Sequence, residues 1–308
     1  MFKFDKEQKE FEIAGVKIGG QPGELPMALI GSIFYEGHEI VRDSKKGFFN
    51  EDKAEALINK QEEMSEKTGN PHIVDVVGST YEALIRYIEF VSRVTRSPFL
   101  VDSPSSTVRL KAIEHCMEVG LGERAIYNSI DENVKPEELE ALKELEVKAA
   151  VVLAFDSSDP RPEGRIGVLK GLKGRKSLLE AAEMAGVKKV LVDTAVLDAP
   201  SIGISARTVY AVKSEFGLPA GCAPSNALTT WKALRKMGPY AISTCIAASH
   251  AFLSVLGADF ALYGPIKYAE TVFPACAMVD AFVAYEGRWR GIKPERSHPL
   301  YRIFSDNS

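Results

Sequence analysis

Carboxylate, carboxamide and hydroxyl side chains follow most of the short apolar segments of this sequence. They are Asp75, Asp102-Ser103, Asn128-Ser129, Asp156-Ser157, Asp193-Thr194 and Ser225-Asn226. Asp and Asn are poor strand formers and are costly to bury without partners. A carboxylate accepts hydrogen bonds from N–H groups, while a carboxamide both donates and accepts. If these side chains meet, they form a hydrogen-bonding pocket suited to a flat, polar heterocycle, such as the pyrimidine edge of a pterin.

The same residues have an alternative, purely structural interpretation. Asp, Asn and Ser are preferred N-caps, so each residue could do no more than start the helix that follows it. In Leu-Val-Asp-Ser, Tyr-Asn-Ser and Val-Asp-Thr, however, the acidic or amide residue still belongs to the apolar segment, and a hydroxyl residue that can cap comes after it. For the group as a whole we therefore favour a binding site over capping.

The apolar segments that precede these residues have the length and composition of buried parallel strands. Each has four to eight mostly apolar residues, at 27–34, 72–77, 98–101, 124–127, 149–155, 188–192, 218–222 and 258–263. Amphipathic segments between them predict helices at 52–67, 80–95, 105–119, 136–145, 177–185, 204–216 and 244–256. Asn50 is a suitable N-cap for the first helix, and several helices are followed by glycine, a usual C′ residue.

Eight strands that alternate with helices, without a glycine-rich dinucleotide motif, favour a closed (β/α)₈ barrel over an open doubly wound sheet. A chain of 308 residues suits one such barrel, so we expect a single domain over 1–308. Residues 1–20 predict a hairpin around Gly15 that covers the N-terminal mouth. We also expect a long basic loop at 156–175 and a short additional helix at about 227–237. In such a barrel the carboxyl ends of all strands converge on one face, which would bring the polar residues together.

Composition excludes several other classes of protein. The net charge of −4 provides no general attraction to nucleic acid or anionic lipid. The four cysteines are scattered, which argues against a disulfide framework or zinc knuckle and favours the cytoplasm. No apolar segment reaches the roughly 18 to 20 residues of a membrane span. The five histidines are separated and no H-x-H motif occurs, so we expect no metal centre.

Several segments closely resemble the MtrH family, the H subunits of tetrahydromethanopterin S-methyltransferase. The most specific is Gly-Gly-Gln-Pro-Gly-Glu at 19–24, and the others are 31–35 with His38, 56–60, 127–130 and 151–155. The resemblance covers nearly the whole chain. More distantly, the polar pairs at the strand ends are similar to those of the pterin-binding barrels of methyltetrahydrofolate:corrinoid methyltransferases and dihydropteroate synthases.

This resemblance implies a pterin-binding (β/α)₈ barrel that takes the N5-methyl group of methyl-tetrahydromethanopterin and transfers it to the cobalt(I) of a corrinoid, a step of methanogenic one-carbon metabolism. By position, Asp102, Asn128 and Asp193 would hold the pyrimidine edge of the pterin, and Asn226 would be the catalytic residue at N5. Further substrate-binding residues would be Ser103, Ser129, Ser225, Asp75 and Asp156. The Ser103-Pro104 pair departs from the Ser-Thr pair that the family leads us to expect.

The chain lacks a D-x-H-x-x-G corrinoid motif, so the resemblance implies that the corrinoid is carried by another polypeptide and none by this chain. We expect that corrinoid subunit, and through it a membrane-bound methyltransferase complex, as partners of a cytoplasmic chain. A homodimer is left open. The predicted loop 156–175 is interpreted either as a docking or lid segment or as an ordinary solvated loop.

Three alternatives remain at this point. The first is a stand-alone methyltetrahydrofolate:corrinoid methyltransferase, because the two pterins share the pyrimidine edge and differ in the tail. The second is a pterin-condensing enzyme of the dihydropteroate synthase type, which should carry a basic diphosphate site at the last strand. Residues 264–267 (Gly-Pro-Ile-Lys) are a weak version of such a site and are interpreted as a turn. The third is a barrel that serves only to assemble the corrinoid protein.

Overall fold

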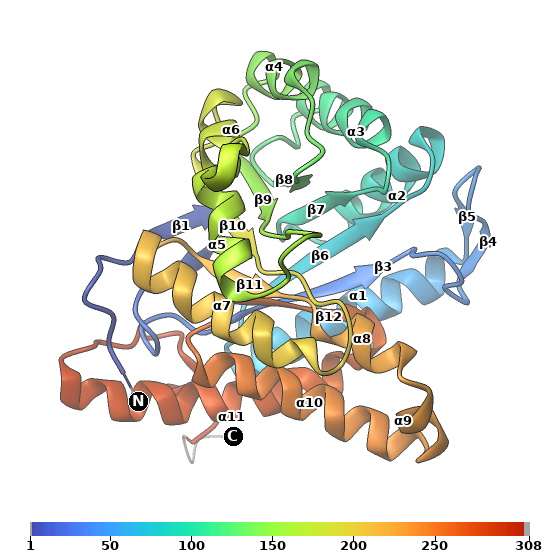
Figure 1. The fold of residues 1–308 in the computed structure, drawn as a ribbon. Helices are drawn as coiled ribbons and strands as arrows, with labels where there is room; N and C mark the ends of the chain where they lie inside the picture. The colour runs from blue at the N-terminus through green and yellow to red at the C-terminus, as the bar shows by residue number, and fades with distance from the viewer. Residues whose placement is uncertain (1, 305–308) are drawn as a thin grey trace.

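The computed structural model, which describes residues 2–304, shows eight parallel strands closed into a barrel (Figure 1). In chain order they are β3 (Ala28–Ile33), β6 (His72–Val77), β7 (Phe99–Asp102), β8 (Ala125–Ile130), β9 (Ala149–Leu153), β10 (Lys189–Asp193), β11 (Ala220–Cys222) and β12 (Phe260–Pro265). Each strand pairs with its neighbours in the chain, and β12 closes the barrel against β3. The predicted (β/α)₈ fold is confirmed.

Helices that follow the strands surround the barrel (Figure 1). They include α1 (Glu51–Thr68), α2 (Tyr81–Val94), α3 (Ser106–Glu118), α4 (Pro136–Glu144), α6 (Leu178–Met184), α7 (Ser201–Phe216), α10 (Pro239–Val255) and α11 (Ala269–Gly287). The predicted N-cap of α1 is confirmed, because the Asn50 carboxamide oxygen accepts the Lys53 N–H at 3.0 Å. Gly69, at the end of α1, has a φ of 88°, which glycine adopts without steric cost.

Three segments differ from the sequence predictions. Residues 156–175 are not one long loop, since they contain α5 (Pro162–Lys170) and a 3₁₀ turn, Leu172–Gly174. The apolar pattern of α5 is interrupted because Gly164, Arg165 and Gly167 occupy its buried face. The additional helix after β11 is in fact two helices, α8 (Pro224–Thr230) and α9 (Lys232–Lys236). A small hairpin of β4 (Val41–Asp43) and β5 (Phe48–Phe49) was not predicted, because strands this short carry little pattern.

The barrel interior begins with an apolar layer made of alternate strand residues. Its members are Ala28, Ile30, Ile73, Leu100, Ile126, Ala149, Val151, Leu191, Phe260 and Leu262. Side chains alternate between the two faces of a strand, so the residue two positions further along also faces the interior. On five strands that residue is polar, namely Ser32, Asp75, Asp102, Asn128 and Asp193. The strand geometry therefore places a polar layer directly above the apolar one, toward the C-terminal mouth.

An antiparallel hairpin closes the opposite mouth. It is formed by β1 (Glu10–Ile13) and β2 (Val16–Gly19). Ile13 and Ile18 are buried and join the apolar cluster of the barrel interior. The hairpin is thus confirmed, although it begins at Glu10 rather than near the first residue. The hairpin thus occupies the N-terminal mouth, and the polar layer lies toward the opposite, C-terminal mouth.

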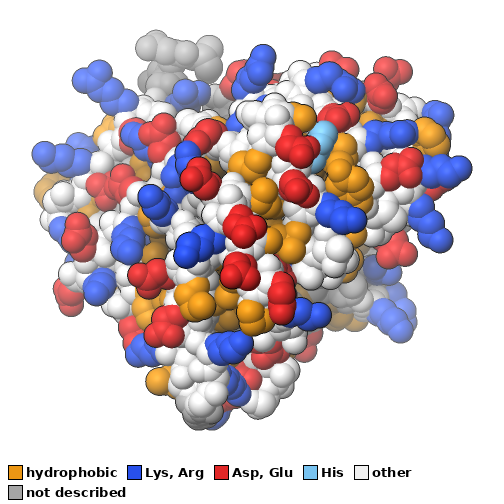
Figure 2. All heavy atoms as spheres, turned by 90° about the horizontal axis from the view of Figure 1, so that it is seen from above, with side chains coloured by type: hydrophobic (Ala, Val, Ile, Leu, Met, Phe, Trp, Pro, Cys, Tyr) orange, Lys and Arg blue, Asp and Glu red, His pale blue; other side chains and the backbone are white. Residues whose placement is uncertain are grey.

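The molecular surface differs strongly between two groups of helices. The face that holds α3, α4 and α6, seen in Figure 2, mixes acidic and basic side chains. By contrast, α10 and α11 pack side by side (Figure 1), and the surface of α10 and of residues 271–285 of α11 carries no exposed charged side chain. No Asp, Glu, Lys or Arg occurs in α10, and Met278, Phe282 and Tyr285 are exposed on α11. No helix among residues 2–304 has both the length and the apolar character that crossing a membrane requires.

Candidate active site

Three carboxylates of the polar layer influence one another electrostatically. Burial raises the pKa of Asp102 to about 6; the positive charge of Arg109 opposes this shift, and the negative charge of Asp193 adds to it. Burial likewise raises the pKa of Asp193 to about 6, against a hydrogen bond from the Ala195 N–H. Burial and the charge of Asp102 raise the pKa of Asp75 well above its ordinary value. These effects are those of carboxylates that lie close to one another.

The oxygen atoms of these carboxylates are only partly used within the protein. The Ser32 hydroxyl donates to Asp75 Oδ2 at 2.6 Å, while Asp75 Oδ1 is buried and has no partner among the described residues. The Ala195 N–H donates to Asp193 Oδ1 at 2.7 Å. In the described part of the chain, no hydrogen bond is donated to the Asp102 carboxylate. Because an unpaired buried acceptor is costly, this set of oxygens fits a ligand that supplies several N–H groups.

Two buried arginines lie close to this group without pairing with it. Arg109 of α3 donates to the Ser103 carbonyl at 2.6 Å and to the Ser129 carbonyl at 3.3 Å. Arg165 of α5 donates to the carbonyls of Thr194 and Ala195. Within residues 2–304 neither guanidinium lies within ion-pair distance of Asp102 or Asp193. The arginines therefore fix the backbone at the end of β8 and after β7 and β10, and they form no ion pair with these carboxylates.

Asn128 lies beside Asp102, since the two residues are register partners on β8 and β7. Both side chains are partly exposed, in contrast to the fully buried Ile126 below them. No side-chain hydrogen bond of Asn128 occurs among the described residues. A carboxamide next to a carboxylate gives this part of the mouth both a donor and acceptors.

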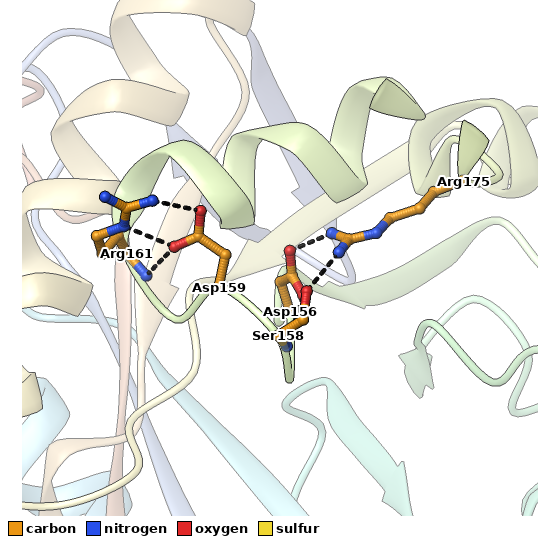
Figure 3. A network of polar contacts seen from close by, with 5 residues as sticks. All are labelled: Asp156, Ser158, Asp159, Arg161 and Arg175. Carbon is orange, nitrogen blue, oxygen red and sulfur yellow. Dashed lines mark hydrogen bonds and ion pairs between the residues drawn. The ribbon is translucent and has the colours of Figure 1, made fainter. Parts of the chain in front are cut away.

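Asp156 has partners of its own in the segment that follows β9 (Figure 3). Arg175, between α5 and α6, forms an ion pair with Asp156, and Ser158 donates to it from both its N–H and its hydroxyl at 2.8 Å. Burial opposes ionisation of Asp156, but these hydrogen bonds outweigh burial and hold its pKa below the ordinary value. Asp156 therefore fastens the segment after β9, and its carboxylate, unlike that of Asp102, is engaged within the protein.

The predicted serines have different surroundings from one another. The buried Ser103 hydroxyl accepts the Ser105 N–H at 3.4 Å, which is a local turn contact. Ser129 is partly exposed and its carbonyl is held by Arg109. Ser225, on α8, is fully buried and its hydroxyl has no partner among the described residues. Only Ser225 thus combines burial with an unused hydroxyl beside the mouth.

Asn226 follows Ser225 on α8 and is exposed. Its backbone carbonyl accepts the hydroxyls of Thr229 and Thr230, whereas its carboxamide makes no hydrogen bond with the described residues. The side-chain oxygen lies near Gly264 at the end of β12. A free amide at the rim, next to the last strand, is what the predicted role at a reacting atom requires.

Ser32 and the two arginines are site features that the sequence analysis did not include. Ser32 could have been found by strand parity, because it lies two residues beyond the inward-facing Ile30. No local pattern marks Arg109 or Arg165, which lie inside helices. His38 is buried against Tyr35, its Nδ1 accepts the Phe34 N–H at 3.2 Å, and burial lowers its pKa to about 4. Across residues 2–304, no group of three or more His, Cys, Asp or Glu is arranged to hold a metal ion.

Fold and site together define a (β/α)₈ barrel with a layer of hydrogen-bonding side chains toward its C-terminal mouth. Solved structures with this architecture include a dihydropteroate synthase of Xanthomonas albilineans with 4-aminobenzoic acid, with a TM-score of 0.59 and 18% identity, covering 90% of this chain and 98% of that one. A Yersinia pestis dihydropteroate synthase with a pterine-sulfa conjugate gives a TM-score of 0.60 and 16% identity, covering 89% and 98%. At such identities the likeness concerns the fold alone.

Sequence comparison identifies the family. The family model described as tetrahydromethanopterin S-methyltransferase MtrH subunit matches residues 6–295, and the chain belongs to this family of methyltransferase subunits. The MtrH protein of Methanothermobacter thermautotrophicus is 46% identical over 309 residues, covering 98% of this chain and all of that protein. The MtrH protein of Methanocaldococcus jannaschii is 44% identical over 318 residues, with the same coverage. The resemblance found in the sequence is thereby confirmed.

Proposed function

We propose that this chain binds methyl-tetrahydromethanopterin at the C-terminal mouth and delivers its N5-methyl group to a corrinoid held by a partner subunit. Family membership supports the methyltransferase activity and a place in a multisubunit complex. The observation that carries the pterin site is the inward-facing polar layer, in which acceptors of Asp102 and Asp75 are unused by the described residues. We treat residues 1–308 as one functional domain.

The pyrimidine edge of the pterin supplies the donors that these oxygens require. Its 2-amino group and N3–H donate to the carboxylates of Asp102 and Asp193, and the Asn128 carboxamide donates to O4. Burial raises the pKa of Asp75 well above its ordinary value, and its unused Oδ1 lies with Ser32 beneath Asp102 at the floor of the site. Ser103, Ser129 and Ser225 complete the lining, while Asp156 acts indirectly by fastening the segment after β9.

Methyl transfer is an in-line displacement at the methyl carbon. The carbon–N5 bond breaks with its electron pair left on N5, the cobalt(I) electron pair forms the new bond to carbon, and N5 takes up a proton from solvent. Amine nitrogen is a poor leaving group unless it is hydrogen-bonded as the bond breaks. The Asn226 carboxamide donates that hydrogen bond, directly or through one water. Fixing the pterin contributes about 7–11 kcal/mol to lowering the barrier, and one preorganised donor contributes about 3–4 kcal/mol.

The corrinoid subunit approaches the open C-terminal mouth, since the hairpin of β1 and β2 closes the other end. Through that subunit the chain associates with the membrane-bound part of the complex from the cytoplasmic side. Whether the donor carries a methanopterin or a folate tail is decided outside the polar layer, which contacts only the shared pyrimidine edge.

We further propose that the uncharged face of α10 and α11 binds a second copy of this chain. Exposed Met278, Phe282 and Tyr285 form a continuous apolar row on α11. Glu270 of the same helix forms an ion pair with Lys60 of its own chain at 3.7 Å. In a two-fold dimer the apolar row of one chain would pack against the same row of its partner, which is the arrangement of an isologous interface.

A direct assay tests the proposed function. The purified chain is mixed with methyl-tetrahydromethanopterin and cob(I)alamin, and formation of methylcobalamin is followed by its absorption spectrum. A parallel reaction with methyltetrahydrofolate tests the alternative donor. We expect transfer from the first donor and its loss in Asp193→Ala. Absence of transfer from both donors, or unchanged pterin affinity of Asp193→Ala in isothermal titration, would contradict the proposal.

A further inference from the structure

Gly264 lies where the register between β12 and β3 shifts. Leu262 pairs with Ile30 and Gly264 pairs with Gly31, so Tyr263 is the extra residue of a β-bulge. Gly264 has a φ of +71°, in the left-handed region that residues with a side chain adopt at a steric cost. The tyrosine ring of the bulge lies over Gly31, where a Cβ atom would come within 2.3 Å of the Tyr263 hydroxyl. Two glycines therefore shape the end of β12.

The start of α8 packs directly against Gly264. A Cβ atom at position 264 would lie 3.0 Å from Ser225 Cβ and 3.7 Å from Asn226 Oδ1. Ser225 is fully buried, so it has little room to retreat. The Asn226 carboxamide makes no hydrogen bond with the described residues, so its place depends on where the backbone of α8 lies. The missing side chain of Gly264 thus determines how closely Asn226 approaches the last strand.

We propose that Gly264 is a positioning residue for Asn226: its lack of a side chain lets α8 rest on the end of β12 so that the Asn226 carboxamide points at N5 of the pterin. This inference rests on the proposed function, because it concerns the residue assigned to N5. A side chain at position 264 would push Ser225, and with it Asn226, away from the strand. The affinity for the pterin would be retained, because the residues proposed to bind its pyrimidine edge, Asp102, Asn128 and Asp193, lie on other strands.

The test is Gly264→Ala, measured by single-turnover methyl transfer and by isothermal titration of the pterin. A displacement of about 1 Å lowers a catalytic rate on the order of 100-fold, and we expect a loss of that size with little change in pterin affinity. Gly120→Ala is the matched control, because Gly120 has a φ of +75° and nothing lies within 4 Å of an added Cβ atom. It should lower the melting temperature through backbone strain and leave the transfer rate unchanged.

A second pair of variants separates the contact from general damage. In the Gly264→Ala background, Ser225→Gly and Ser225→Ala both remove the hydroxyl, but only Ser225→Gly removes the Cβ atom that the new methyl group meets. We expect the glycine double variant to transfer methyl groups faster than the alanine double variant, because both lack the hydroxyl and they differ only in that Cβ atom. The comparison also serves if Gly264→Ala alone fails to fold, since recovery of folding and transfer by the glycine variant only would support the contact. Equal behaviour of the two double variants would overturn it.

Failure of this inference can be told apart from failure of the proposed function. If Asn226→Ala transfers methyl groups at the wild-type rate, the assigned role at N5 is wrong. If Asn226→Ala is slow and Gly264→Ala is as fast as wild type, only the positioning role of Gly264 is wrong. A parallel loss of rate and pterin affinity in Gly264→Ala would likewise overturn the positioning role.

Discussion

Replacing Asp193 with asparagine should stabilise the folded chain at alkaline pH. Burial raises the pKa of the Asp193 carboxyl from 3.8 to about 6. Each pKa unit corresponds to about 1.36 kcal/mol, so the ionised side chain costs the folded state about 3 kcal/mol relative to a neutral group of the same shape. Asparagine is such a group, and its carbonyl oxygen can still accept the Ala195 N–H that Asp193 binds at 2.7 Å.

The sign of this effect depends on pH. The folded-state pKa lies above the unfolded value, so the carboxyl favours folding in its protonated form. Below about pH 3.8 it is neutral in both states and the substitution should change little. Between that pH and about 6 the cost of burying the charge grows, and above pH 6 it is constant. We therefore expect Asp193→Asn to raise the free energy of unfolding by about 3 kcal/mol at pH 8 and by little at pH 4.

Urea denaturation followed by circular dichroism at both pH values measures this difference. Asp52→Asn, at an exposed position in the first turn of α1, is the control for loss of one negative charge. A loss of stability at pH 8, or an equal gain at the two pH values, would refute the reasoning. The same variant should lose pterin binding in isothermal titration, because asparagine replaces one carboxylate oxygen by an NH₂ group, which cannot accept an N–H of the pterin.

Three further outcomes are expected. Asn226→Ala should slow single-turnover transfer about 10²- to 10³-fold while pterin affinity changes little, and an equal loss in both would exclude the role at N5. The dissociation constant of the pterin should be constant above pH 7 and rise below pH 6, because burial raises the pKa of both Asp102 and Asp193 to about 6 and the ionised forms bind. Isothermal titration over pH 5–8 measures this, and a dissociation constant that does not change with pH would contradict it. Phe282→Lys, on the exposed face of α11, should lower the sedimentation coefficient to that of a monomer, whereas the control Tyr81→Lys on α2 should not. If the wild-type chain itself sediments as a monomer, the proposed interface is excluded.

The barrel strands and the polar layer were predictable because both depend on short-range patterns. The segment 72–77 was predicted with the bounds that β6 has in the structure, since a continuous apolar run between helices has few other interpretations. Asp102, Asn128 and Asp193 were recognised because each ends such a run. Strand parity, had it been applied from Ile30, would have added Ser32.

The remaining features depend on tertiary contacts that the local sequence does not encode. The helix α5 was missed because its buried face consists partly of glycines and of Arg165, which is stabilised there by carbonyls of the segment after β10. Asp156 looked equivalent to the other strand-end acids until the structure showed Arg175, nineteen residues later, paired with it. No spacing rule relates a strand end to an arginine beyond the next helix.

The hairpin of β1 and β2 closes the N-terminal mouth of the barrel, so we expect ligands to enter and leave through the C-terminal mouth. If the pterin lies at the polar layer as proposed, the corrinoid must stand above it, and the spent pterin can leave only after the corrinoid has withdrawn. Binding would then follow a compulsory order, with the pterin first to arrive and last to depart. A high concentration of the corrinoid protein would slow turnover, because it would block release of the pterin product. The cause is the burial of Ile13 and Ile18 in the N-terminal end of the barrel, which closes the other route.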